Sequence, residues 1–597
     1  MLFCLSSLAI FAQTTDAKPQ IAQNIGIVDE KRQSVETPSP EISHSTAVKS
    51  TSILSRVGTN TDQTVPLTLN EAIRRALENN NAIEIARDDV RFAETQLRSL
   101  LGVYDGVLSI TPNFSRNSST GQTSTRNYSA NSSFSKILEN GGGSYNTFFN
   151  LNKTGLSSRS ITSTSLSSGA TASNQATAGI SYTQPLLRNF RVDGNRRQIK
   201  IQRKVLQQSD ADFRRQTIEI VTQVQRGYWD LVFALRDQQN RTENLNLSKE
   251  NLRRIEASIS AGKSAPLERA AIATELANRE IDVLTAAQQV SIADNTLKTL
   301  LLKEPTSPQW TQTFVPTDKP VFSLDPINLE DALKDAIENR SELRRLGLQK
   351  EVNKINLDYY ENQTKPQIDL KTSLTFGGTS YNGLTTTSST FPIITPGLTT
   401  SADSFLLSQI NTLRLSQGLS SLALNNIPTV TSPGSSNYLA GGTFRSVENL
   451  FRTDAPSFSV GVIISFPLKN QTAKANLAGA EVQKNQIEAQ TRSQQQTVVA
   501  EVRNAVQAVE TSRQTVLTSR RATENAEIQL TGERKLYDAG RSTTFLLFQR
   551  ENALASARNA EIRAETNYNK ALADLQRATS TTFRVNNIEV DSPVKDK

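Results

Sequence analysis

The sequence contains a single cysteine and a single histidine among its 597 residues. A zinc site built from Cys and His, a disulfide framework and a His-based catalytic triad each need more of these residues than the chain has. No apolar run of about 18 residues follows the N-terminus, which excludes a helical membrane protein. The net charge of +8 is small for so long a chain and gives no support for a nucleic-acid partner.

Enzyme motifs are missing as well. Residues 262–264 (GKS) have the ending of a phosphate-binding loop, but Ala257 stands where that loop needs a glycine, and the segment follows a helix rather than a strand. There is no nucleophile elbow or dinucleotide fingerprint. The carboxylates Glu501 and Glu510 lie on a long amphipathic helix and are expected to be solvated. We therefore predict a protein that is not an enzyme and needs no cofactor or metal.

The N-terminal segment predicts export from the cytoplasm. Residues 2–11 are mainly apolar, and Ala12 is a small residue suited to the edge of a cleavage site. We interpret residues 1–12 as a signal peptide that lacks its basic leading region, with a disordered apolar tail as the alternative. Residues 13–66 are rich in Ser, Thr, Gln and Pro and predict a disordered extension, in which we expect no role for His44.

The rest of the chain contains two copies of one unit. Residues 67–73 (LTLNEAI) align with residues 327–333 (INLEDAL), and AGKS from Ala261 matches AGRS from Ala539. Two copies of about 260 residues explain the length better than four unrelated domains. The expected organisation is repeat 1 at 67–302, a proline-rich linker at 303–326, repeat 2 at 327–580 and a C-terminal tail at 581–597.

Each copy predicts the same order of elements: a helix, strands, a long helix and a return helix. Apolar residues at three–four spacing on the long helices predict coiled-coil-like packing. At about 1.5 Å per residue each long helix measures roughly 100 Å, and two of the shorter return helices stacked end to end match that length. In the first copy the first helix is expected to open after Thr68 or Asn70, either of which can cap it, and to run to about Tyr104. The other expected helices are 194–261 and 266–302 in the first copy, and 328–362, 471–539 and 543–578 in the second.

Four segments alternate apolar and polar residues with a period of two and predict strands. Each is about ten residues long, which suits a tilted strand that crosses a bilayer, although a soluble β-sandwich is the alternative. The Ser/Thr/Asn/Gly-rich stretches between them are expected to be outward-facing loops, and one contains a further candidate hairpin whose place relative to a barrel stays open. The strands are expected near 108–114, 177–182, 368–376 and 458–466, the loops at 116–175 and 378–456, and the hairpin at 131–138 and 145–151.

Four strands are too few to close a barrel, for which about eight are needed. An open sheet edge is not tolerated inside a membrane. The strand pattern therefore predicts a barrel that is shared between copies of the chain. Three copies would supply twelve strands, and the helices of roughly 100 Å would extend that barrel as a tube.

This arrangement resembles the TolC-like outer membrane efflux family over about residues 67–580. The resemblance implies a mainly α fold with β: long antiparallel helical hairpins, forming an α-barrel in a homotrimer, joined to four or more strands of a shared transmembrane β-barrel, in two internal repeats. It implies a channel in the outer membrane lipid with a large periplasmic part. It rests on the repeated opening at Leu67, Leu69 and Ala72, on Gln184-Pro185-Leu186 after a strand, and on the paired AGKS and AGRS segments.

The resemblance also implies partners. Such a channel docks to a periplasmic adaptor protein and an inner-membrane transporter, as part of a tripartite efflux pump or a type I secretion system, and exports small molecules or proteins. In the family the hairpin tips contact the adaptor, and the tip glycines end helices at the same time. The matching docking residues are Gly262, Ser264, Gly540, Arg541 and Ser542.

A periplasmic gate is implied near the same tips. In the family a tyrosine, acids and an arginine hold this entrance closed, and Tyr537 and Glu268 fall on matching positions. Ser542 stands at the arginine position, and Leu546 and Gln549 stand where the acidic constriction ring would be. These departures imply a more apolar or differently gated entrance.

Two other functions remain open. The chain could be a coiled-coil structural protein of the cell envelope with no pore. An adaptor subunit is disfavoured because we find no lipoyl-like domain of short strands between helical arms.

Overall fold

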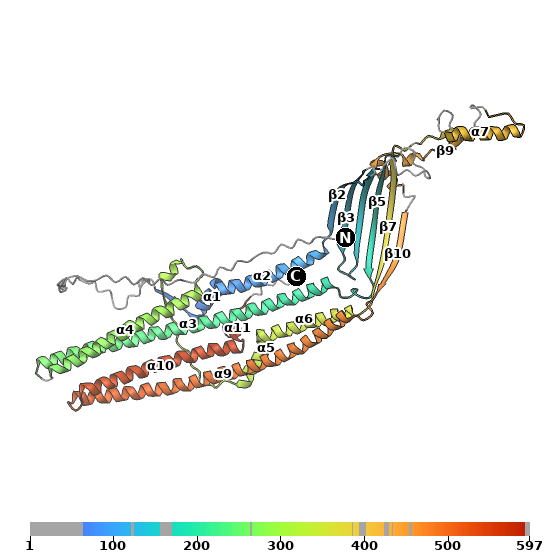
Figure 1. Ribbon diagram of the computed structural model, residues 1–597. Coiled ribbons are helices and arrows are strands. Elements are labelled where there is room, and N and C mark those ends of the chain that lie inside the picture. Colours follow the sequence, from blue (N-terminus) through green and yellow to red (C-terminus); the bar gives the residue numbers. More distant parts are fainter. Residues whose placement is uncertain are drawn as a thin grey trace, which may run out of the picture. The chain divides into compact units, whose positions relative to one another are not determined.

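The computed structural model describes residues 64–120, 124–155, 170–262, 265–384, 386–392, 401–422, 429–432, 434–452 and 456–590 (Figure 1). The expected signal peptide and most of the expected N-terminal extension lie outside these residues. Within the described ranges, no helix combines the length and the apolar character needed to cross a membrane.

The first helix of each repeat is broken in two, whereas the sequence predicted one continuous helix. The first break falls at Asn80, whose backbone N–H completes the first helix by donating to the Ala76 carbonyl. The Asn80 side chain then caps the next helix by accepting from the Ala82 N–H at 2.9 Å. The second break falls at Arg340, the equivalent position. The helices are α1 (Leu69–Asn79) and α2 (Asn81–Leu101), with a 3₁₀ turn at Gly102–Tyr104, and α5 (Leu329–Asn339) and α6 (Ser341–Gln363).

Two helical hairpins follow, as the sequence predicted. α2 and α4 both pack along α3, and α6 and α10 both pack along α9, so two shorter helices accompany each long one. In the first repeat, Ile83 of α2, Val221 of α3 and Leu297 of α4 share one buried core. The hairpins are α3 (Gly194–Ser260) with α4 (Pro266–Leu301), and α9 (Gln471–Asp538) with α10 (Thr544–Ala578).

A six-stranded antiparallel sheet completes the two repeats (Figure 1). Its order is β10-β7-β5-β4-β3-β2. The connections from α2 to β2, from β5 to α3, from α6 to β7 and from β10 to α9 all lie at one end of the sheet. We call this end the helix end and the opposite end the loop end. The strands are β2 (Val107–Asn117), β3 (Thr125–Ile137), β4 (Ser144–Gly155), β5 (Ala172–Pro185), β7 (Gln367–Asn382) and β10 (Pro456–Ser465).

The four expected strands are present as β2, β5, β7 and β10, and two further strands join the sheet where a long loop over 116–175 was expected. The candidate hairpin forms β3 and β4, and both are longer than expected and pair inside the sheet. Their signal was weak because aromatic residues such as Phe134 and Phe149 alternate with Ser and Asn rather than with charged residues. The polar composition of these strands therefore hid a regular period of two.

The expected loop over 378–456 also contains ordered elements. α8 (Thr443–Leu450) packs on β5 and β7 near the loop end, where Gly378 lies against the α8 backbone and leaves no room for a Cβ. The other elements of this stretch are β8 (Ser389–Pro392), α7 (Ser401–Ser416), β9 (Thr429–Ser432) and a 3₁₀ turn at Asn437–Leu439. β8 and β9 pair with each other.

Segments expected to be irregular also contain short elements. The expected linker holds a 3₁₀ turn (Pro308–Thr311) and β6 (Thr313–Pro316), and β6 pairs in parallel with β1 (Thr64–Leu67). Burial explains this pairing, because Phe314 and Leu67 are fully buried against the first-repeat core. The expected tail begins with α11 (Thr582–Val585).

Candidate functional site

The tips of the two helical hairpins carry most of the expected site residues. α3 ends at Ser260 and α9 at Asp538, and each is followed by a glycine in the left-handed region, Gly262 at φ 69° and Gly540 at φ 71°. An added Cβ would meet no atom within 4 Å at either glycine, so backbone conformation rather than space requires glycine here.

The second tip is a complete Schellman turn. The Gly540 N–H donates to the Tyr537 carbonyl at 2.9 Å, and the Arg541 N–H donates to the Leu536 carbonyl at 2.8 Å. Thr543 then caps α10 by accepting from the Leu546 N–H. At the first tip the Gly262 N–H donates to the Ile259 carbonyl at 2.9 Å, and Pro266 begins α4. These bonds fix two short reversals of the chain.

The structure brings the two expected gate residues, Tyr537 and Glu268, into electrostatic range of each other. Burial raises the pKa of the Tyr537 hydroxyl, and the nearby Glu268 carboxylate raises it further. The hydroxyl is therefore protonated at neutral pH and can act as a hydrogen-bond donor. The Tyr537 ring packs against the small apolar core of the second hairpin, which includes Leu530 and Leu547.

The remaining expected site residues divide into inward and exposed positions. Ser542, expected as a docking residue, turns inward, and its hydroxyl donates to Glu533. Arg541 is exposed, as are Leu546 and Gln549, the residues at the expected acidic positions. Ser264 lies outside the described residues.

Each tip also presents a large apolar side chain that was not expected from the sequence. Leu267, in the first turn of α4, is 80% exposed, and Phe545, in the first turn of α10, is 74% exposed. The two residues stand at equivalent positions, five residues beyond Gly262 and Gly540. Exposed apolar residues at matching places on both tips form a surface suited to another protein.

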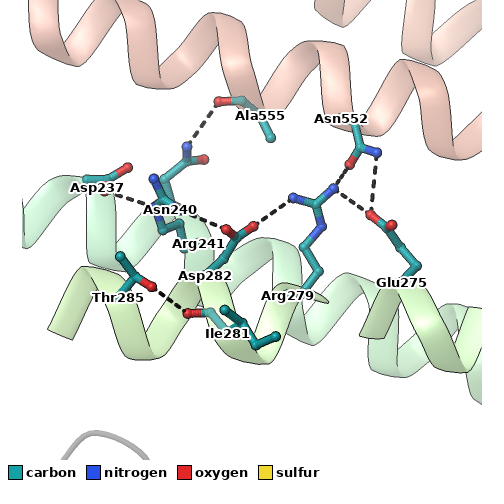
Figure 2. Close-up of polar contacts among 10 residues, drawn as sticks. All are labelled: Asp237, Asn240, Arg241, Glu275, Arg279, Ile281, Asp282, Thr285, Asn552 and Ala555. Atoms are coloured by element: carbon teal, nitrogen blue, oxygen red, sulfur yellow. Dashed lines mark hydrogen bonds and ion pairs between the residues drawn. The ribbon is translucent and has the colours of Figure 1, made fainter. Parts of the chain in front are cut away.

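A cluster of polar contacts connects the two hairpins, and we call it the hairpin clamp (Figure 2). Arg279 of α4 donates to Asn552 of α10 and to Glu275 on its own helix. It also contacts Asp282 at 3.1 Å, and Asp282 is shared with Arg241 of α3 at 3.1 Å. The clamp therefore holds three helices from both repeats.

Two carboxamides of α3 extend the clamp to either side. The Asn240 Nδ2 donates to the Ala555 carbonyl of α10 at 3.1 Å. The Asn251 Nδ2 donates to the Glu551 Oε2 at 3.0 Å, and Arg534 of α9 lies 3.4 Å from the other carboxylate oxygen. Burial raises the pKa of the Glu551 carboxyl, against the lowering effects of Arg534 and Asn251.

The hairpin clamp was not predicted from the sequence because its residues are polar side chains on polar helices, where solvent-exposed side chains are expected. A signal was present: Asn240 and Asn251 stand at buried positions of α3, between the buried residues Leu231, Leu245 and Ile255. A carboxamide inside an apolar stripe needs a hydrogen-bond partner, which here comes from the other hairpin.

Among the residues that the structure describes, no three His, Cys, Asp or Glu side chains are arranged to hold a metal ion. The arrangement consists of two helical hairpin tips, an exposed apolar residue on each tip, and polar contacts that join the two hairpins.

Comparisons with known proteins agree with this arrangement. The profile of the outer membrane efflux protein family matches residues 149–301 and 423–581, which together make up just over half of the chain and fall in the two repeats. None of the curated protein sequences compared with the chain matches it significantly.

Solved structures of similar fold are outer-membrane channels. The Campylobacter jejuni CmeC outer membrane channel is 13% identical with a TM-score of 0.54, over 88% of this chain and 90% of that one. The open state of the Neisseria gonorrhoeae MtrE outer membrane channel is 16% identical with a TM-score of 0.53, over 86% and 88%. VceC from Vibrio cholerae, an outer membrane protein, is 13% identical with a TM-score of 0.54, over 86% and 95%. At these identities the likeness concerns the fold.

Proposed function

The chain belongs to the outer membrane efflux protein family, and on that premise we propose that it is the outer-membrane channel of a tripartite efflux pump or a type I secretion system. Three copies enclose the channel: their sheets form a barrel in the outer membrane and their helical hairpins form a periplasmic tunnel. Small molecules or proteins pass outward through it. No enzymatic step is assigned to the chain.

One observation carries this proposal more than any other. The six-stranded sheet has one apolar face and two edge strands, β2 and β10, that each pair with only one strand among the described residues. Edge strands are incompatible with hydrocarbon unless they find partners, and a ring of copies supplies these partners. The helical hairpins, connected to one end of that sheet, then continue the ring.

The tips serve as docking and gating sites in this proposal. Gly262, Ser264, Gly540, Arg541 and Ser542 are the docking residues named from sequence, and we add the exposed side chains Leu267 and Phe545. The periplasmic adaptor protein covers these apolar residues, and the inner-membrane transporter joins through it. Glu268 and Tyr537 form the gate, and the hairpin clamp keeps the two hairpins together when the gate is closed.

Cell fractionation combined with gel mobility of unboiled samples tests the proposal. We expect the protein in the outer-membrane fraction, migrating as a trimer before boiling and as a monomer afterwards. A pore-free coiled-coil structural protein, the second candidate, would give a monomer in both lanes or would leave the outer membrane in a salt wash.

A further inference from the structure

We propose that the β3–β4 hairpin is part of the membrane wall, so that three copies close an eighteen-stranded barrel rather than a twelve-stranded one. This inference rests on the proposed function, because it takes the trimer as given. It concerns what each copy contributes: six strands, with β2 of one copy pairing with β10 of the next.

The hairpin is inserted without disturbing the order or direction of the other strands. β2, β3, β4 and β5 follow one another as antiparallel neighbours, so removal of β3 and β4 would leave β2 and β5 still antiparallel. With six alternating strands, the two edge strands β2 and β10 also run in opposite directions. They are 11 and 10 residues long, so an antiparallel pair between neighbouring copies is matched in length.

The register of the sheet places apolar side chains on one face across all six strands. On β2, Leu108 and Ile110 are 63% and 68% exposed, and on β10, Phe458 and Ile464 are 70% and 63% exposed. The same face continues through the hairpin. Its members, read along the paired positions, are Leu108, Ile110 and Phe114 on β2, Phe134, Ala130 and Tyr128 on β3, Phe149 and Leu151 on β4, Ala178 and Ile180 on β5, Leu370 and Leu374 on β7, and Val460 and Val462 on β10.

The opposite face of the hairpin is polar and uncharged. β3 presents Asn131 and Ser133 there, and β4 presents Asn146 and Asn150. Two apolar residues are exceptions on this face: Phe148, packed against Gly179, and Ile137 at the end of β3. Alternation of this kind, apolar toward lipid and polar toward the lumen, is what a barrel wall requires. In a hairpin that plugged the lumen or stood above the membrane, nothing would require the apolar residues to share one face of the sheet with those of β2 and β5.

The length of the inserted strands agrees with this placement. β3 has 13 residues and β4 has 12, more than the roughly 9–11 needed to cross the hydrocarbon. At the loop end, α8 covers the same face of β5 and β7 at Gly378, which pairs with Ala176 and so lies level with Leu151 of the hairpin.

The consequence is a wider lumen. With strands spaced about 4.8 Å apart and tilted by about 40°, a ring of eighteen strands has a backbone diameter of about 36 Å, and a ring of twelve about 24 Å. The cross-section therefore roughly doubles. Since the inserted strands add uncharged side chains to the lumen, ion selectivity should change little.

Cysteine accessibility in intact outer membranes tests the wall directly. The only cysteine, Cys4, lies in the expected signal peptide, so single-cysteine variants need no further background changes. We expect Asn150→Cys to react with a small water-soluble maleimide and Phe149→Cys to resist it. Gly461→Cys and Val460→Cys, the equivalent pair on β10, are the matched controls. Equal reaction at positions 149 and 150, with alternation kept on β10, would overturn the inserted wall; loss of alternation on β10 as well would overturn the proposed function.

A deletion of residues 124–155 provides the second measurement. If the shortened chain closes with twelve strands, its single-channel conductance should fall to less than half. A deletion variant that forms trimers with unchanged conductance would contradict the proposal. If the variant does not assemble, the accessibility pattern alone decides.

Discussion

The Asn251 side chain of α3 donates a hydrogen bond to the buried Glu551 carboxylate of α10 at 3.0 Å, and so joins a helix of the first repeat to a helix of the second. Their contact belongs to the clamp that keeps the two helical hairpins side by side near the tips.

The Glu551 carboxyl predicts a pH-dependent stability. Burial raises its pKa above the ordinary 4.5, so the folded chain binds this proton more tightly than the unfolded chain. Stability therefore falls as pH rises from about 4.5 through the raised value. We expect Glu551→Gln, which removes the buried charge and keeps one acceptor oxygen for the Asn251 amide, to raise the thermal unfolding midpoint at pH 7 and to have less effect at pH 4.

Asn251→Leu is the matched change on the other side of the contact. It leaves the buried Glu551 carboxylate without the Asn251 donor, and we expect a loss of about 1–3 kcal/mol in the free energy of unfolding. A midpoint equal to that of the unchanged protein at pH 7 for both variants would show that this contact does not hold the hairpins.

The gate predicts an effect on conductance. Tyr537→Phe removes the hydroxyl whose pKa burial and Glu268 raise, and so removes one donor at the closed entrance. We expect a larger single-channel conductance or a more frequent open state in planar bilayers. Tyr568→Phe, in the buried core of α10, is the control and should leave conductance unchanged. Identical recordings for Tyr537→Phe and the unchanged protein would count against a gating role.

The exposed tip residues predict a docking defect. Leu267→Glu and Phe545→Glu place a charge where we expect the adaptor to cover an apolar side chain, so co-purification with the adaptor and export should both fall at least tenfold. Ile528→Glu changes an exposed apolar residue on α9 and serves as the control. Trimer formation should be normal in all three variants. Docking that tolerates both tip substitutions would refute this surface.

A fully buried ion pair in α4 predicts a large stability effect. Lys298 and Asp294 lie 2.8 Å apart, at 0% and 1% exposure, and the Lys298 ammonium also donates to the Trp310 carbonyl. Lys298→Met removes the cation that lies 2.8 Å from the buried Asp294 carboxylate and should cost about 3–5 kcal/mol in the free energy of unfolding. The double change Lys298→Met with Asp294→Leu should cost clearly less, and equal costs would mean that the pair does not act as a unit.

Periodicity predicted the long elements because each has many residues with one consistent pattern. The apolar stripe through Val221, Val224 and Tyr228 predicted α3. The alternation of apolar and polar residues through Phe458, Val460 and Val462 predicted β10. The match between the two repeats predicted where the hairpin tips lie, because the matching segments contain the glycines that end the long helices, Gly262 and Gly540.

Other features depend on contacts between distant parts of the chain, which local patterns do not reveal. The Asn80 backbone N–H ends α1 and its side chain caps α2, so the apolar residues keep a helical period across the break. β6 is four residues long and forms because Phe314 finds the first-repeat core. The clamp residues Arg279 and Asn552 meet only after both hairpins have folded.

Planar-bilayer recording of the purified trimer tests the channel most directly. We predict stepwise, long-lived conductance steps from the unboiled trimer, with a larger unitary step than the 124–155 deletion variant gives. An outer-membrane trimer that inserts and yet shows no conductance step at any voltage would contradict the proposed channel.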